Sequence, residues 1–401
     1  MKLITRLISL LAVCAAVVVS AVSAVEGHAD GEHTSVQTAA GENGSDAGRI
    51  AFGKCRAAAV YECTTGTLLA GYNEKEVLPA GHLAKLMTFL IAAEMVSCGD
   101  LSLEDTAVCS HNANSQQGSQ IWLDEGEKIS VSELMRSISV GNANDACVCL
   151  AERICASEKA FTDAANRKAK SLDMNDSYFE DSTGTSENTR ITAADACRLC
   201  SELVKYKDFA DCFTTWIDTV RNGKAELVSR NRLMRTYKGT SGFKVCYTPN
   251  LGECAAVCAE RGDMVLCAVV LGADDEDQLF KQIKDMLDSA FGSYEIYFPE
   301  VPEEAVSDMP VGHGEKPACK TDIPGLSPAV IKKGTYRSIE VGFQREEKLE
   351  APVSAGTTVG HISFSINGSE LISEDICTAE TVDKVDFAFS FKRILSNLLK
   401  I

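Results

Sequence analysis

The chain has 401 residues, of which 45% are hydrophobic and 24% are charged, and its formal net charge is −18. This length predicts two or three domains, and the composition excludes a disordered or fibrous protein. The acidic balance argues against a nucleic-acid partner, because phosphate binding needs clustered Lys and Arg side chains.

The first 24 residues have the order of a secretory signal peptide. Lys2 and Arg6 precede an apolar run over residues 7–22, and the small residues Ser23 and Ala24 follow it. We expect cleavage after Ala24 and export of the mature chain. Residues 25–49 are rich in Gly, Ser, Ala and acidic residues without an apolar period, which predicts a flexible leader.

The chain contains 17 cysteines, an unusual number for its length. Export would favour disulfides, but disulfide frameworks belong to short chains that lack a large core. Seven of the cysteines lie inside apolar runs, where cysteine acts as a small hydrophobic residue: Cys147, Cys149, Cys197, Cys200, Cys254, Cys258 and Cys267. The pair Cys197 and Cys200 has the spacing of zinc ligands, but no second Cys-x-x-Cys follows. We therefore expect buried, reduced thiols, no metal site and no cofactor.

From residue 50 to residue 293 the pattern predicts one compact α/β domain. The apolar residues 57–61 predict a strand. Apolar residues at helical spacing from Leu83 to Ile91 predict an amphipathic helix, with Lys85 turned away from its apolar face. Residues 264–271 are continuously apolar, which is typical of a buried strand. Residues 294–310, with three prolines among acidic residues, predict a linker.

Residues 311–385 predict a small all-β domain, because apolar residues alternate at 339–343 and again at 362–366 between Gly and Asn turns. Residues 386–401 return to a helical period, with Phe387, Phe391 and Leu398 on one face and basic residues elsewhere. Such a segment associates with a membrane surface. The alternative, a helix docked on its own β domain, fits the same pattern.

Three stretches carry polar residues in positions that suggest chemistry. The first, Leu78-Pro-Ala-Gly-His82-Leu-Ala-Lys85, opens the apolar helix, so that residues 82 and 85 are neighbours on it. The second, Val140-Gly-Asn142-Ala-Asn144-Asp145, separates two helical segments. The third ends in a strand on which Lys244, Cys246 and Thr248 share one face.

In order and spacing these stretches resemble the three motifs of the low-molecular-weight penicillin-binding proteins, the serine-type D-alanyl-D-alanine carboxypeptidases (peptidase family S11). The segments at 65–69, 123–127, 269–273 and 349–360 also look like family segments. The resemblance implies a transpeptidase/β-lactamase-like domain, with an antiparallel sheet and flanking helices, followed by a small all-β domain. It implies a hydrolase that takes peptidoglycan stem peptides ending in D-Ala-D-Ala and also binds β-lactams.

The family motifs are Ser-x-x-Lys, Ser-x-Asn and Lys-Thr-Gly, and each has lost at least one member here. His82 occupies the position of the nucleophile and Lys85 that of the base. Asn142 replaces the serine of the second motif, in which Asn144 remains. Lys244 survives in the third motif.

Val245 and Cys246 replace the other two residues of the third motif, which leaves Lys244 and Thr248, with Asn144, as the predicted substrate-binding residues. Asn144 also has an alternative role as a helix N-cap. An acyl-imidazole on His82 would be labile, Asn142 does not titrate, and Cys246 places a side chain where glycine lets a substrate backbone approach.

We therefore expect an exported protein that lies at the extracellular face of the cytoplasmic membrane or in the cell wall. Its expected role is in peptidoglycan biogenesis and cell shape. It binds stem peptides or a wall-synthesis partner and is a catalytically impaired pseudoenzyme. The alternative is an active carboxypeptidase with a non-standard nucleophile, either His82 or Cys246, or a water molecule activated by Lys85. Ser241, three residues before Lys244, is set aside because the two side chains of a strand at that spacing face opposite sides.

Overall fold

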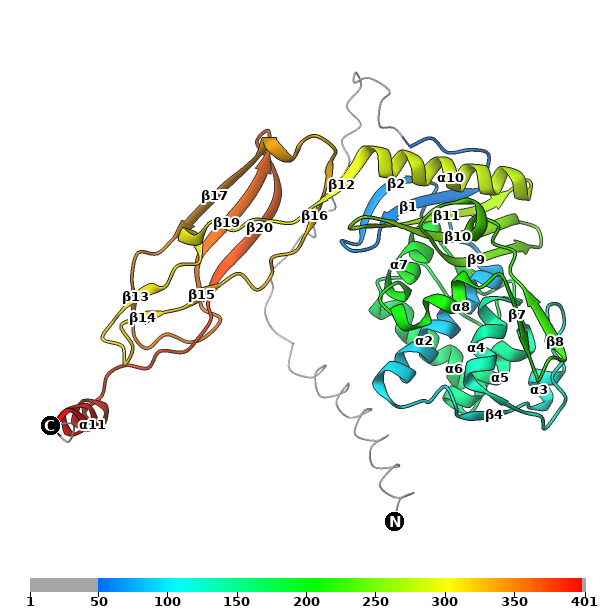
Figure 1. The fold of residues 1–401 in the computed structure, drawn as a ribbon, viewed down its shortest axis with the longest axis horizontal. Coiled ribbons are helices and arrows are strands. Elements are labelled where there is room, and N and C mark those ends of the chain that lie inside the picture. The colour runs from blue at the N-terminus through cyan, green and yellow to red at the C-terminus, as the bar shows by residue number, and fades with distance from the viewer. Residues whose placement is uncertain (1–49, 399–401) are drawn as a thin grey trace, which may run out of the picture. The chain divides into compact units, whose positions relative to one another are not determined.

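The computed structural model describes residues 50–398, and the predicted signal peptide and leader, with residues 399–401, lie outside this range. An α/β domain is followed by a smaller β domain and a terminal helix (Figure 1). The last long helix of the α/β domain ends at Ser293. The segment predicted as a linker contains a short strand, a 3-10 turn and the start of another strand.

A five-stranded antiparallel sheet forms the centre of the α/β domain, with strand order β2-β1-β11-β10-β9. The strands are β1 (Ala57–Glu62), β2 (Thr67–Tyr72), β9 (Thr240–Thr248), β10 (Gly252–Arg261) and β11 (Met264–Ala273). The predicted strands at 57–61 and 264–271 are thereby confirmed. Both lie inside the sheet, which explains their uninterrupted apolar sequence.

Residues of these strands alternate between two cores, as the period of two requires. On one face, Ala58 and Val270 pack with α10 (Glu276–Ser293). On the other face, Ala59 and Val269 pack with α2 (Lys85–Cys98) and α7 (Ala193–Leu203). The predicted arrangement, an antiparallel sheet with flanking helices, is confirmed.

Helix α2 lies at the centre of the helical layer, and all its residues from Lys85 to Ala93 are buried. The expectation that Lys85 points away from an apolar face is therefore wrong: neighbouring elements cover the whole circumference of the helix, and the Lys85 side chain is 0% exposed. The stretch Gly81–Cys98 has the length and hydropathy of a membrane span, but two thirds of it is buried inside this domain.

The remaining helices of the domain begin at side-chain caps or tight turns. Ser130 caps α4 by accepting from Glu133 N at 3.2 Å, and Thr192 caps α7 by accepting from Asp195 N at 3.0 Å. The other helices are α3 (His111–Asn114), α4 (Val131–Ser139), α5 (Asn144–Cys155), α6 (Glu158–Ser171), α8 (Ala210–Thr214) and α9 (Leu233–Thr236), with 3-10 turns η1 (Gly81–Ala84) and η2 (Lys207–Phe209).

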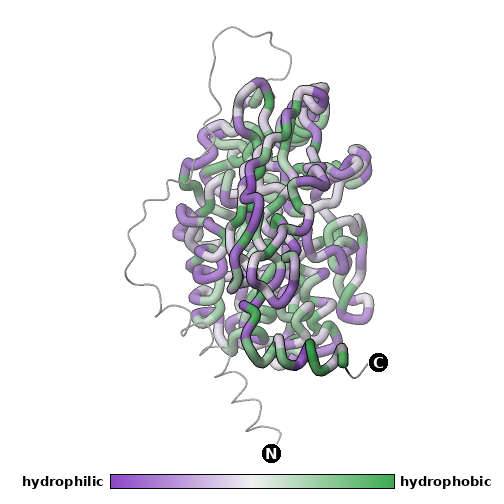
Figure 2. The backbone as a smooth tube through the Cα atoms, turned by 90° about the vertical axis from the view of Figure 1, so that its left-hand side faces the viewer, coloured by the Kyte–Doolittle hydropathy of each residue, from purple (hydrophilic) through white to green (hydrophobic). Residues whose placement is uncertain are grey.

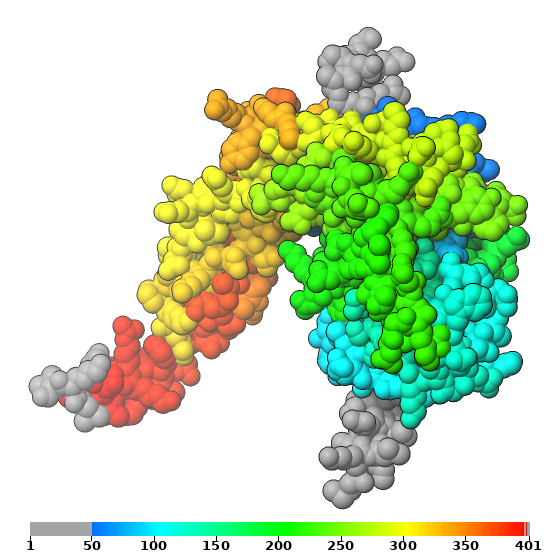
Figure 3. Space-filling model, turned by 45° about the vertical axis from the view of Figure 1, so that its right-hand side comes forward, coloured from blue at the N-terminus to red at the C-terminus, as the bar shows by residue number. Residues whose placement is uncertain are grey.

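Three two-stranded ribbons complete the α/β domain: β3 (Leu78–Pro79) with β6 (Arg190–Ile191), β4 (Thr106–Val108) with β5 (Lys128–Ser130), and β7 (Ile217–Val220) with β8 (Ala225–Val228). The β7–β8 turn is held to the α4 region, because Arg221 N donates to Glu133 Oε1 at 2.9 Å and its guanidinium donates to Glu127. In Figure 3 the green surface (residues around 200–230) adjoins the cyan surface (residues around 100–140).

The β domain has its own core, which includes Phe364, Ile362 and Ile376, all 0% exposed. Its longest pairing joins β19 to β17 and β20, with Phe364 opposite Val341 and Ile372. Its elements are β12 (Tyr294–Tyr297), β13 (Met309–Gly312), β14 (Ala318–Cys319), β15 (Thr321–Asp322), β16 (Ala329–Lys332), β17 (Ile339–Arg345), β18 (Leu349–Glu350), β19 (Thr358–Ile366) and β20 (Ser369–Thr378), with 3-10 turns η3 (Glu303–Ala305) and η4 (Tyr336–Ser338).

The chain continues into helix α11 (Phe387–Leu398), which contains both hydrophilic and hydrophobic residues (Figure 2). Its apolar side chains are exposed: Phe387 by 84%, Ile394 by 60% and Leu398 by 64%. The helix predicted for this segment is present.

Candidate active site

The first motif lies on the turn η1, which is held between two other segments. A Cβ atom at Gly81 would lie 2.1 Å from Thr248 Oγ1, at the end of β9. A Cβ atom at Gly184 would lie 1.7 Å from Gly81 O. Both glycines have positive φ angles. Two close approaches therefore fix the turn that carries His82 against β9 and against the loop around Gly184.

Lys85, at the predicted base position, is buried beside that turn. Its Nζ donates to Thr183 O at 2.8 Å. Burial lowers the pKa of Lys85 to about 8, although nearby Cys147 and Cys246 oppose the shift. A lysine in this state is neutral in an appreciable fraction of molecules near neutral pH, which is the condition a general base needs.

Lys244, from the third motif, is the second buried lysine of the site. It is 2% exposed, and its Nζ donates to Ile138 O and to Ser139 O, the latter at 3.3 Å. Burial and the charge of Lys85 lower the pKa of Lys244 to about 7. The two amines are therefore close enough for electrostatic repulsion between them to lower the pKa of Lys244. The hydrogen-bond acceptors of both amines are main-chain carbonyl oxygens.

His82 stands next to both lysines. Burial, followed by the charges of Lys85 and Lys244, lowers the pKa of His82 to about 3. The imidazole is therefore neutral at physiological pH. It has the protonation state of a nucleophile, but no carboxylate is hydrogen-bonded to it among the described residues to orient the ring.

The second motif lies between α4 and α5. Asn142 takes the left-handed conformation, with φ +57°, and its Nδ2 donates to Val245 O at 3.4 Å, which links the second motif to the third. Asn144 Nδ2 donates to Gln117 O. The alternative role of Asn144 as N-cap is wrong, because Ala143 is the N-cap of α5 and Asn144 already has helical geometry.

Three oxygen atoms at this site are buried without a hydrogen-bond partner: Asn142 Oδ1, Asn144 Oδ1 and Thr248 Oγ1. Each belongs to a motif position or to a predicted substrate-binding residue. A buried polar atom without a partner destabilises a fold by roughly 1–3 kcal/mol. Its persistence here marks a place where a ligand's hydrogen-bond donor would find an acceptor.

Cys246 fills the position that glycine has in the family. Its thiol interacts with the His82 main chain and with the Thr248 side chain, and burial raises its pKa despite the neighbouring lysines. A protonated, buried thiol is a poor nucleophile. Cys147 lies on the other side of Lys85, with its Sγ 3.1 Å from Ser182 O, and burial raises its pKa to about 11.

Sequence reasoning missed the loop around Ser182, Thr183 and Gly184, which supplies the acceptors for Cys147, Thr88 and Lys85. Asp181 organises this loop. Burial works against its charge, yet hydrogen bonds from Thr183, Thr189 and Thr185 hold the pKa of Asp181 below its usual range. The signal in the sequence is a run of Asp, Ser, Thr and Gly at 181–186, which indicates a loop but not its partners.

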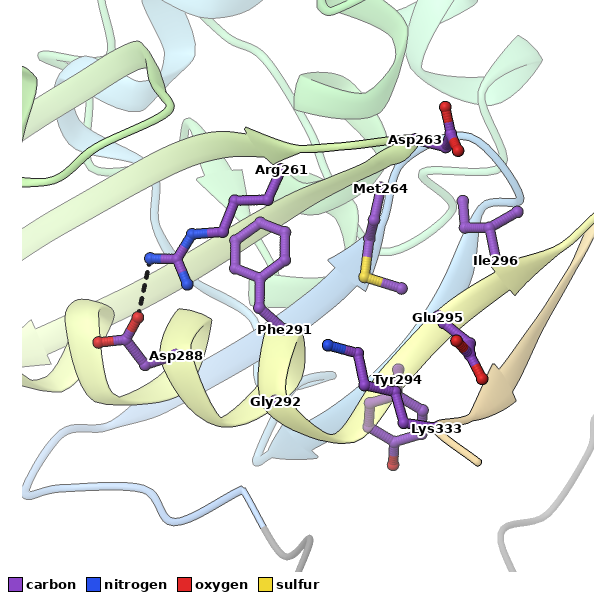
Figure 4. A pocket seen from close by; sticks show the side chains of 10 residues that line it. All are labelled: Arg261, Asp263, Met264, Asp288, Phe291, Gly292, Tyr294, Glu295, Ile296 and Lys333. Carbon is purple, nitrogen blue, oxygen red and sulfur yellow. Dashed lines mark hydrogen bonds and ion pairs between the residues drawn. The ribbon is translucent and has the colours of Figure 1, made fainter. Parts of the chain in front are cut away.

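Three cavities of the described residues lie outside the motif site. One of about 500 Å³ is shown in Figure 4, where Arg261 points toward Asp288 and the two side chains are 2.9 Å apart. The Arg261 guanidinium also stacks on the Phe291 ring at 4.6 Å. Its charge is therefore already matched within the protein. The other two cavities measure about 290 and 590 Å³.

The sheet, the helical layer and the two-lysine site define a chain of the transpeptidase-like class. A family profile described as D-alanyl-D-alanine carboxypeptidase matches residues 51–275, and one described as penicillin-binding protein 5, C-terminal domain, matches residues 303–384. The chain therefore belongs to the D-alanyl-D-alanine carboxypeptidase family, the low-molecular-weight penicillin-binding proteins. This family acts on peptidoglycan in cell-wall biogenesis, outside the cytoplasm, which agrees with the predicted export.

Similar proteins support both the family and the two-domain fold. The D-alanyl-D-alanine carboxypeptidase DacF of Bacillus subtilis is 29% identical over 352 residues, which cover 86% of this chain and 90% of that protein. Penicillin-binding protein 5 from Haemophilus influenzae superposes with a TM-score of 0.75 at 20% identity, covering 82% of this chain and 98% of the other. Penicillin-binding protein D2 from Listeria monocytogenes, in its ampicillin-bound form, gives 0.54 at 26% identity, covering 59% and 97%.

Proposed function

We propose that this chain binds the D-Ala-D-Ala end of peptidoglycan stem peptides and does not hydrolyse it. The observation that carries the proposal is the pair His82 and Cys246: the nucleophile position holds an imidazole without an orienting carboxylate among residues 50–398, in place of a serine hydroxyl, and burial raises the pKa of the thiol beside it. Lys85 and Lys244 remain next to both. Partly charged amines attract a terminal carboxylate without needing a nucleophile.

The unpartnered oxygens support a binding role. Asn142 Oδ1, Asn144 Oδ1 and Thr248 Oγ1 are buried without a hydrogen-bond partner in the described part of the chain, and they would accept from peptide N–H groups if the site opens to admit a stem peptide. His82, Lys85 and Asn142 hold the predicted catalytic positions, and Asn144, Lys244 and Thr248 the predicted substrate-binding positions. Non-covalent binding of β-lactams, which also carry a carboxylate, is part of the same proposal.

A fluorescent penicillin separates this proposal from an active enzyme. The purified protein is incubated with the probe, denatured and digested, and we expect no covalent adduct. An adduct on His82 or Cys246, or release of D-alanine from a D-Ala-D-Ala peptide, would establish the rival hypothesis of a non-standard nucleophile. Release of D-alanine without any adduct would point to water activated by Lys85.

Binding is measured separately, by calorimetry and by thermal shift with a D-Ala-D-Ala peptide. We expect a measurable shift with the D,D-peptide and a weaker one with the matched L-Ala-L-Ala peptide. The Lys244→Gln variant should lose most of the affinity, because it removes one of the two buried positive charges that would attract the carboxylate. The absence of a shift with either peptide would favour a purely structural role.

A combined variant, His82→Ser, Asn142→Ser, Val245→Thr and Cys246→Gly, restores all three motifs on this scaffold. If only the motif losses impair catalysis, this variant should be acylated by the fluorescent penicillin. The matched control restores the other three positions but keeps Cys246. Its side chain would still occupy the space that the family's glycine leaves open for the substrate, next to the serine introduced at position 82. Continued inactivity of the full variant would show further defects in the scaffold.

We propose that α11 holds the protein at the outer face of the cytoplasmic membrane. The exposure of its apolar side chains supports membrane association over docking on the β domain, and Lys392 and Arg393 add attraction to anionic lipids. Flotation with phosphatidylglycerol vesicles should recover the full chain, and Leu395→Glu should abolish recovery. Val341→Glu, an exposed apolar position of β17, is the control.

Export with cleavage after Ala24 predicts a mature N-terminus at Val25, which N-terminal sequencing checks.

A further inference from the structure

Thiols from separate segments meet between the central sheet and helix α7. Cys200 comes from α7, Cys258 from β10 and Cys267 from β11, and their three Sγ atoms all lie within 4.8 Å of one another. Cys258 and Cys267 are direct cross-strand partners. All three side chains are 0% exposed. The register of one strand pair and the docking of one helix therefore create a compact group of sulfur ligands.

Two further thiols border this group. Cys197 lies one helical turn before Cys200, and its thiol interacts with that of Cys267. Cys63 directly follows β1, and its thiol interacts with that of Cys258. Each of them is therefore a candidate for the fourth sulfur ligand of the group.

We propose that Cys200, Cys258 and Cys267 bind one thiophilic metal ion, Zn²⁺, with Cys63 or Cys197 as the fourth ligand. Zinc sites of this type are tetrahedral with Zn–S bonds of about 2.3 Å, which places the sulfur atoms about 3.8 Å apart. The observed separations of up to 4.8 Å need to close by roughly 1 Å or less. Soft thiolate sulfur selects Zn²⁺ or Cu⁺ over hard cations.

The group has a route to solvent. Cys63 is 7% exposed and lines a cavity of about 590 Å³, together with Tyr206, Phe213 and Ser241. An ion that enters this cavity meets the Cys63 thiol first and then that of Cys258. A buried site that is otherwise closed on all sides would require the domain to unfold before it could load.

Without metal the thiols are protonated, because burial raises the pKa of Cys200 and Cys258 well above the usual range and that of Cys267 to about 12. The ion displaces one proton from each thiol that it binds, and these protons pass to solvent. Four thiolates and one Zn²⁺ leave a net charge of −2. The charge of the Arg198 guanidinium acts on Cys197, but this guanidinium is also paired with Asp195 Oδ1 at 2.6 Å, so it offsets only a small part of the negative charge.

The test uses the full mature chain, purified without a metal-binding tag in reducing, oxygen-free buffer, and measures zinc by mass spectrometry. We expect about one zinc per chain after dialysis against Zn²⁺ and then buffer. Co²⁺ loading should give the visible spectrum of a tetrahedral thiolate site. Cys200→Ser and Cys258→Val should each lose at least tenfold in affinity, while Cys63→Ser and Cys197→Ser identify the fourth ligand.

Cys254→Ser is the matched control, because Cys254 is equally buried on the same face of β10 but lies outside the group. It should retain the zinc. A zinc content that falls equally in the control, or stays below a tenth of an ion per chain in the wild type with added Zn²⁺ and Cu⁺, would overturn the proposal. So would a disulfide between Cys258 and Cys267 in protein isolated without oxidation. Binding of Cu⁺ alone would support the thiolate site and correct the ion.

Discussion

Two buried clusters lie on the same face of the central sheet, and they differ in charge. At the edge strand β9, Lys244 packs near Lys85 and His82, with lowered pKa values and unpartnered oxygens around them. Further inside the sheet, Cys258 and Cys267 form a neutral group of thiols. Burial disfavours the charged form in both, but only the lysines titrate near neutral pH as a result.

This difference shows what each cluster contributes to stability. A thiol in a core packs as a small apolar group and adds to the hydrophobic energy. A buried amine loses its hydration, and two carbonyl hydrogen bonds do not replace it fully. The lysine cluster therefore destabilises the fold, which is what a site retained for binding a ligand is expected to do.

The largest effect is expected for Gly184→Ala, which tests the close approach that fixes the turn beside the charged cluster. The new methyl group would overlap Gly81 O, at 1.7 Å, on the turn that carries His82. We expect a loss of more than about 4 kcal/mol in the free energy of unfolding, or no folded protein at all. Gly66→Ala is the control, since Gly66 has a similar φ of +68° and nothing within 4 Å. It should lose only about 1 kcal/mol in urea unfolding, and equal losses would contradict the close approach.

Lys244→Met removes one buried charge while keeping the length of the side chain. Because the pKa of Lys244 is about 7 in the folded chain, below the ordinary lysine value of 10.5, the unfolded chain binds more protons between these pH values. The stability of the wild type should therefore rise from pH 7 to pH 10. The variant should be more stable by about 3 kcal/mol at pH 7 and show a flatter profile. Unfolding by urea across this range measures both effects, and a less stable variant would show that the carbonyl contacts dominate.

His82→Asn tests the third member of the charged cluster. The pKa of His82 is about 3 in the folded chain, below the ordinary histidine value of 6.5, so the unfolded chain takes up a proton first as the pH falls. The wild type should lose stability between pH 6.5 and pH 4, by up to about 3 kcal/mol more than the variant. Parallel profiles for wild type and His82→Asn would argue against a buried, neutral imidazole.

The smallest effect is expected for Cys258→Val in metal-free protein. Valine is apolar and close to cysteine in volume, so the free energy of unfolding should change by less than about 1 kcal/mol. With Zn²⁺ present, the wild type alone should gain stability, because only it retains the full ligand set. A large loss in the metal-free variant would show that the thiols do more than pack.

Much of the fold and the positions of the motifs could be predicted from the sequence. Apolar runs indicated β1 and β11, and the order of the three motifs indicated that His82, Asn142 and Lys244 belong to one site. The structure brings these residues together. Local patterns of this kind are reliable because they depend on neighbouring residues only.

What the sequence did not predict depends on contacts between distant segments. A helical period shows one apolar face, so it could not show that Lys85 is enclosed by the loop at Thr183. Cys-x-x-Cys spacing finds ligands within one segment, whereas Cys258 and Cys267 meet through strand register and Cys200 joins them through helix packing. The role of Asn144 was misjudged because α5 begins with an uncapped Ala143.

The sixteen cysteines of residues 50–398 are all free thiols, and eleven of them are buried. During synthesis the unfolded chain exposes every one of them, and any oxidant then present can form non-native disulfides faster than the native core forms. Folding and oxidation are therefore in kinetic competition. Once the native core has formed, it shields the buried thiols from oxidants. This protection lasts until the chain next unfolds globally.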